Sequence, residues 1–155
     1  MDYDFLIKDL HLNKSQKSIG TDKGLAKIGD GIVNLTYSVA KSIFLTKNNP
    51  NKKIVRTGKK VGKNILDTAL KNANMKSYAK TRANAHDLAD TVESLIAYIW
   101  LNNKMTIKEI INFLVENLSG DLNNRNEEIK NATTAFTNLL NFIKKFLPEK
   151  KKDER

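Results

Sequence analysis

The sequence of 155 residues contains no cysteine, only two histidines and only two prolines. Without cysteine, the chain has no disulfide bonds, thiolate zinc sites or cysteine nucleophiles. The two histidines, His11 and His86, are too few and too far apart in the sequence to indicate the histidine-built centre of a metalloprotease. Any metal chemistry therefore has to use carboxylate oxygens.

Long apolar segments are also absent from the sequence. No run of apolar residues approaches the length that is needed to span a bilayer. The N-terminal segment MDYDFLIKDL opens with acidic residues and lacks the basic and then apolar layout of a signal peptide. We therefore expect a cytoplasmic protein with no membrane partner.

The chain has the size and composition of one domain. A hydrophobic content of 40% at this length is enough for a single core. We expect one domain over residues 1–147, because Pro148 ends the last predicted helix. Residues 148–155, PEKKKDER, form a charged tail that we expect to be disordered.

The charge of the protein is strongly basic, with 27 Lys and Arg against 17 Asp and Glu. A basic protein favours a polyanionic partner, because each neutralised phosphate releases condensed counterions. Nucleic acid is therefore the first hypothesis. Charge alone is equally compatible with a lysine-rich composition or a heat-stable surface that serves no partner.

The apolar residues recur at helical spacing, and no stretch alternates with the period of two that a half-buried strand needs. This pattern predicts an all-α fold. Polar residues up to Gly20 and the basic segment NNPNKKIVRTGKK interrupt the pattern and are predicted to be loops. The predicted helices cover about residues 3–10, 24–46, 61–74, 84–102, 106–118 and 124–147.

The helix over residues 24–46 carries two apolar rows, which predicts a wide buried face and a central place in the bundle. Asp30 falls on the second row, so we expect its carboxylate to point toward the packed side. A buried carboxylate is costly unless it has a partner, a metal or a function. Its neighbours Gly29 and Gly31 indicate that another helix or a ligand approaches the backbone closely.

The helix over residues 84–102 carries a second acidic feature in the string HDLADTVESLIAYIW. Asp90 and Glu93 are three residues apart and therefore lie on one face. If the Asp30 helix packs beside this one, the three carboxylates suit a magnesium ion. Alternatively, DTVE is a capping box at a helix start. His86 and Asp87 are candidates for outer contacts to the metal ligands, or for ordinary surface and capping roles.

Two strings together resemble the catalytic domain of ribonuclease III. LAKIGDGIVNLTYSVAKSIFL resembles the family's signature helix, roughly Leu-Glu-Phe-Leu-Gly-Asp-Ala-Val-Leu, and DLADTVESLIAYIWL resembles its second acidic motif. The resemblance covers about residues 20–118, in the family's order. It is greatest to the compact archaeal-type and Mini-III proteins, which lack a double-stranded-RNA-binding domain.

The resemblance implies a helical bundle of the ribonuclease III endonuclease type, which cuts double-stranded RNA in RNA processing. It assigns Asp30, Asp90 and Glu93 as catalytic and metal-binding residues, with Mg²⁺ as cofactor and Mn²⁺ able to substitute. It further implies a homodimer, with the signature helices near the twofold axis. The long-form family has glutamates where this sequence has Ala26 and Lys23, which removes potential ligands.

Double-stranded RNA would be held by its phosphates and 2′-hydroxyls rather than by its bases. Two segments supply the cations for this contact, the basic loop and the approach to the second acidic helix. The expected RNA-binding residues are Lys52, Lys53, Arg56, Lys59, Lys60, Lys63, Lys80 and Arg82. A solvated, flexible loop is the alternative for the first segment.

Two other functions stay open at this point. The protein could be a non-catalytic RNA-binding or ribosome-associated member of the same fold, since Ala26 and Lys23 stand where the long form has acids. It could also be a structural helical bundle whose basic surface touches DNA or an anionic membrane. The last reading predicts no preference for RNA over DNA.

Overall fold

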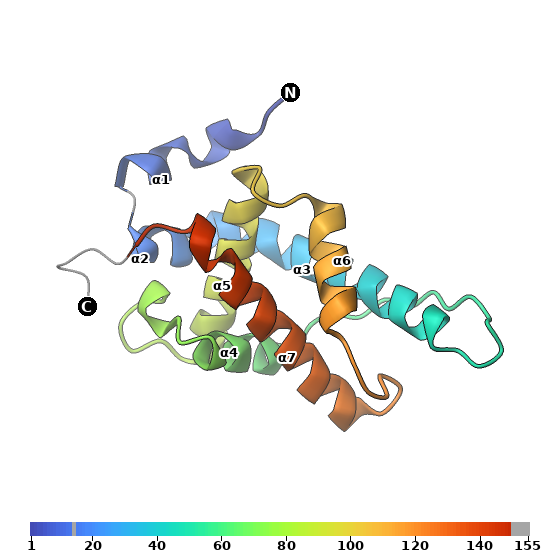
Figure 1. Cartoon of the computed structure of the whole chain (residues 1–155). Coiled ribbons are helices and arrows are strands. Elements are labelled where there is room, and N and C mark those ends of the chain that lie inside the picture. The colour runs from blue at the N-terminus through green and yellow to red at the C-terminus, as the bar shows by residue number, and fades with distance from the viewer. Residues whose placement is uncertain (14, 150–155) are drawn as a thin grey trace.

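The computed structural model describes residues 1–13 and 15–149, and within them it contains helices and loops but no strand (Figure 1). The all-α prediction is confirmed. The helices, with η for 3₁₀ turns, are η1 (Asp4–Ile7), α1 (Lys8–Asn13), α2 (Gln16–Gly20), α3 (Lys23–Lys47), α4 (Lys63–Asn72), η2 (Lys76–Tyr78), α5 (Ala85–Leu101), α6 (Ile107–Asn117), α7 (Arg125–Ile143) and η3 (Lys144–Phe146).

The longer helices begin at side-chain caps that the sequence makes visible. Asp22, Asn84, Thr106 and Asn124 each accept a hydrogen bond from the backbone N–H three residues later. The loop predicted up to Gly20 is wrong in part, because α2 lies there. A helix this short has no visible apolar repeat, and its stability comes from tertiary contacts.

The core forms around α5, most of whose residues are buried. α3 packs mainly on α5 and also on α6, while α4 packs on α5 and α7 (Figure 1). The wide buried face predicted for α3 is only half correct, because Ile28 and Leu35 are 38% and 54% exposed. The row that contains Val33 and Tyr37 is covered, whereas the other row is buried only at Leu25 and Ile32.

Gly29 sets the distance between α3 and α5. A Cβ atom at Gly29 would overlap the backbone carbonyl of Glu93. The missing side chain therefore lets the two helices approach and brings Asp30 beside Glu93. Gly31 has no neighbour within 4 Å and faces outward, so only one of the two expected close approaches exists.

The basic segment after α3 is ordered by hydrogen bonds. Residues 54–61, here called the strap, run back beside α3 toward α4 (Figure 1). Three α3 hydroxyls each bond both the N–H and the C=O of one strap residue, and the pairs are Ser38 with Lys59, Ser42 with Thr57 and Thr46 with Val55. Four helical residues rise about 6 Å and two extended residues about 6.6 Å, so the spacings match. The flexible-loop alternative is wrong for the strap.

The chain ends described by the structure are consistent with one core. The Nε2 atom of Gln16 donates to the backbone oxygen of Pro148 at 3.1 Å, which ties the end of the chain to α2. The rest of the predicted tail, residues 150–155, lies outside the described residues. None of the described helices combines the length and the apolarity that crossing a membrane requires.

Candidate active site

A cleft of about 760 Å³ opens between α3, α5 and the start of α4. It is lined by Lys23, Ala26, Lys27 and Asp30 of α3, by Lys60, Val61, Gly62, Lys63 and Leu66 of the strap and α4, and by His86, Ala89, Asp90 and Glu93 of α5. The structure therefore brings all three predicted acids to one cleft. Cations from three segments surround them.

Glu93 is the buried acid of this cleft, with 8% exposure. Its burial, a hydrogen bond with Asp30 and the charges of Asp30 and Asp90 raise its pKa from 4.5 to about 8, against a smaller opposite effect of Lys60. At neutral pH the Glu93 carboxyl is therefore protonated and shares its proton with Asp30. Two carboxyl groups from different helices are in direct contact.

Asp30 itself is exposed, and the prediction that it points toward the packed side is wrong. Gly29 takes the position against α5, so the next residue reaches into the open cleft. The Nδ2 atom of Asn34 donates to Asp30 Oδ1 at 3.2 Å. Asn34 also accepts from the N–H of Val61, so one side chain connects Asp30 to the end of the strap.

Asp90 faces the same cleft but has a basic partner. The Nζ atom of Lys23 lies 3.3 Å from Asp90 Oδ2, and the Nε2 atom of His86 lies 3.8 Å from the same oxygen. His86 also lines the cleft. The three carboxyls thus divide into an Asp30–Glu93 pair and an Asp90–Lys23 pair.

The capping alternative for Asp90 and Glu93 is wrong. The capping box of α5 consists of Asn84 and Asp87, which exchange hydrogen bonds of 2.9 and 3.0 Å. These bonds, together with Lys80 at 3.3 Å, hold the pKa of Asp87 below its usual range. Asp87 is thus bound by Asn84 and Lys80, and it does not line the cleft.

In the part of the chain that the structure describes, no three Asp, Glu or His side chains are close enough together to hold a metal ion as they stand. The donor set nevertheless suits magnesium, which prefers carboxylate oxygens and keeps several waters. A cation bound between Asp30 and Glu93 would relieve the repulsion that helps to raise the pKa of Glu93.

The predicted RNA-binding residues fall into separate groups. Lys60 and Lys63 line the cleft, and Arg56 is exposed on the strap. Lys59 lies on the other side of the strap, where its charge helps to lower the pKa of Glu128. Lys52 and Lys53 are exposed at the turn after α3.

Lys80 and Arg82 line a second hollow of about 310 Å³ before α5, together with Lys17 and Lys76. A small hollow lined by Lys23, Lys80 and Asp90 lies between this region and the cleft. Lys23 and Lys27 were not predicted from the sequence as residues of the cleft, although both lie on the same face of α3 as Asp30. Their spacing of seven and three residues was the available signal.

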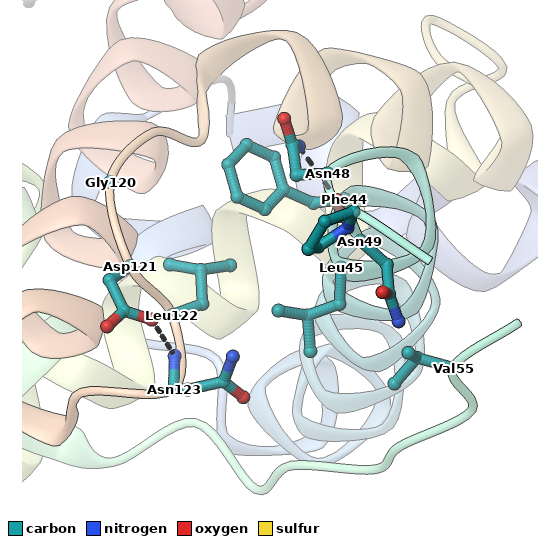
Figure 2. A pocket seen from close by; sticks show the side chains of 10 residues that line it. Phe44, Leu45, Asn48, Asn49, Val55, Gly120, Asp121, Leu122 and Asn123 are labelled. Carbon is teal, nitrogen blue, oxygen red and sulfur yellow. Dashed lines mark hydrogen bonds between the residues drawn. The ribbon is translucent and has the colours of Figure 1, made fainter. Parts of the chain in front are cut away.

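A different hollow, of about 300 Å³, lies at the far end of α3 and contains none of the predicted acids or cations. Figure 2 shows its apolar side chains Phe44, Leu45 and Leu122 among the amides of Asn48 and Asn123. Phe44 follows Asp30 by fourteen helical positions, or about 21 Å along the axis. This hollow is therefore separate from the cleft.

The fold and cleft define an all-helical protein with paired carboxyls in a basic surface. Residues 23–149 match the family model for Ribonuclease III, and the chain belongs to this family. The matched region contains the whole of α3 to α7 with all three acids. A comparison with curated proteins finds no match.

Proposed function

We propose that the protein is a metal-dependent endoribonuclease that hydrolyses phosphodiester bonds of double-stranded RNA in RNA processing. Family membership supports a nuclease. The observation that carries the proposal is the contact between Asp30 and Glu93, with Asp90 in the same cleft. Carboxyl groups from two helices meet there at a protein surface rich in lysine.

Asp30 and Glu93 are the proposed magnesium ligands, with Asp90 as a third carboxylate. Bound there, magnesium or manganese would activate a water molecule and neutralise charge on the phosphate. Lys27, Lys60 and Lys63 line the same cleft and would attract the phosphates of the substrate. Ala26 is buried in the cleft floor, so this chain offers no carboxylate where the long form has one.

The strap is the proposed path for one RNA strand toward the cleft. Ile54, Arg56, Gly58 and Lys60 are exposed, whereas the alternate residues are covered. Since the hydroxyls of α3 fix this alternation, Arg56 and Lys60 are held outward at a spacing of about 13 Å. Lys52, Lys53, Lys80 and Arg82 are exposed and would extend the contact on both sides.

The proposed active species is a homodimer that contacts through α3. Ile28 and Leu35 are exposed on the outer face of α3, and Gly31 between them has open space around it. Such a face allows a second helix to approach closely, and a twofold dimer would present two clefts to one RNA duplex. We expect Leu35→Glu to be monomeric in light scattering, whereas an unchanged dimer would place the interface elsewhere.

The proposed activity is tested by incubating the purified protein with long double-stranded RNA and Mg²⁺, beside Glu93→Gln. We expect cleavage by the wild type and at least a hundredfold loss in the variant, since a metal ligand is gone. Equal cleavage by both would indicate a contaminating nuclease. Binding without cleavage in the wild type would favour a non-catalytic RNA-binding protein, and equal binding of DNA would favour a structural role.

A further inference from the structure

Lys23 has an unusual place for a cation. It is the first residue of α3, where the helix dipole disfavours positive charge. Its side chain is 71% exposed and could extend into water. Instead its ammonium lies 3.3 Å from Asp90 Oδ2 at the edge of the cleft.

The surroundings of Lys23 are acidic on the α5 side. Its charge also helps to hold down the pKa of Asp87. Asp90 and Lys23 line both the main cleft and the small hollow beside it. The ammonium therefore pairs with Asp90 at the edge of the cleft and lies on the acidic side of α5.

Lys23 also changes how many acids remain for a metal. Asp30 and Glu93 are in contact with each other, and among the described residues no lysine lies within ion-pair distance of either. Asp90 is already paired with an ammonium that belongs to the same chain. A second divalent ion at Asp90 would have to displace this charge and would lie close to it.

We propose that the Lys23 ammonium is a built-in cation that takes the place of a second metal ion, so that each cleft binds a single divalent ion at Asp30 and Glu93. This inference rests on the proposed function and specifies its metal requirement. In two-metal sites the second ion neutralises charge on the phosphate and the leaving oxygen. A lysine is able to supply a point charge for a phosphate oxygen in the same way.

The test counts Mn²⁺ ions on the full chain by calorimetry and by the electron paramagnetic resonance signal of free Mn²⁺, at a pH above the Glu93 pKa. We expect one ion per chain in the wild type and in Lys23→Arg, which keeps the charge. Lys23→Glu is expected to bind two, because it removes the ammonium and adds a carboxylate beside Asp90.

Lys27→Glu is the matched control for added charge. Lys27 lines the same cleft from the next turn of α3 but forms no ion pair with a described acid. We expect it to stay at one ion. Thermal unfolding of each variant checks the fold, which the exposure of Lys23 should preserve.

Two ions in the wild type, or one ion in a folded Lys23→Glu, would overturn the inference. Two ions together with cleavage of RNA would leave the proposed nuclease function intact. A wild type that binds no Mn²⁺ and cuts no RNA would overturn the proposed function, and with it this inference. One ion in the wild type, two in Lys23→Glu and one in Lys27→Glu would support it.

Discussion

Replacing Glu93 by Gln should stabilise the metal-free protein at alkaline pH while abolishing its metal binding. Gln has nearly the shape of Glu and is able to donate to Asp30, but it never ionises. In the wild type the folded state raises the Glu93 pKa from 4.5 to about 8. The folded protein therefore holds a proton that the unfolded chain releases between these values, and stability falls as pH rises through this window.

The size of the effect follows from the same shift. A rise from 4.5 to about 8 corresponds to an upper limit of about 5 kcal/mol lost at alkaline pH. Water entry and side-chain movement reduce this loss, so we expect about 1–3 kcal/mol, or roughly 2–12 °C in Tm. Below about pH 4.5 both proteins carry a neutral group at this position and should have similar stability.

The assay is thermal unfolding of both proteins without metal, at several values between about pH 4 and pH 9. The Tm of Glu93→Gln relative to the wild type should rise with pH. Adding Mn²⁺ should reverse the order at alkaline pH, because only the wild type gains binding energy. A Tm difference that does not change with pH would refute the assignment of Glu93 as the carboxyl group whose pKa is raised by folding.

Three further tests concern the strap, the contact between α3 and α5, and the ion pair of Lys41 with the buried Glu128. In filter-binding titrations, Arg56→Ala should reduce the slope of log K against log salt concentration by roughly 0.7–0.9, which corresponds to one lost phosphate contact. Lys59→Ala, on the covered side of the strap, should leave this slope unchanged. In the monomeric Leu35→Glu background, Gly29→Ala should cost about 1–3 kcal/mol in denaturant unfolding by pushing α3 from α5. Gly31→Ala, which has open space within the protomer, should be neutral or stabilising there. Lys41→Met should cost about 3 kcal/mol at neutral pH by leaving the Glu128 carboxylate without its cation. The cost should shrink in acid, because the carboxylate of the variant becomes protonated at a higher pH than that of the wild type, whose pKa is held low.

The sequence was sufficient for the long helices because their periodicity and caps are local. The helices capped by Asp22, Asn84 and Thr106 start within one or two residues of the predicted positions. The five residues of α2 carry no such repeat, and α2 depends on distant contacts such as Thr91 Oγ1 with the carbonyl of Gly20. Periodicity in one segment cannot reveal a partner seventy residues away.

The arrangement of the acids was predictable only in part. The spacing of Asp90 and Glu93 indicated a common face, and the resemblance placed Asp30 with them. Which acid is buried depends on how α3 and α5 cross, and Gly29 decides that crossing. For the same reason the pairing of Asp90 with Lys23 was not predictable, since their neighbourhood exists only once α5 lies against the start of α3.

Two buried glutamates beside α3 show how the partners of a buried carboxyl group decide the direction of its pKa shift. Glu128 is 4% exposed, and both Tyr37 Oη and Lys41 Nζ lie 2.8 Å from its Oε2 atom, so its pKa is lowered despite burial. Glu93 is almost as buried, yet its nearest charged neighbours are acids and its pKa is raised. Burial opposes the charged form of both groups, and the opposite direction of the two pKa shifts comes from the partners. Among the described residues Glu93 has no cation at ion-pair distance, so we expect its charged form to be favoured only when a cation from solution binds the Asp30–Glu93 pair.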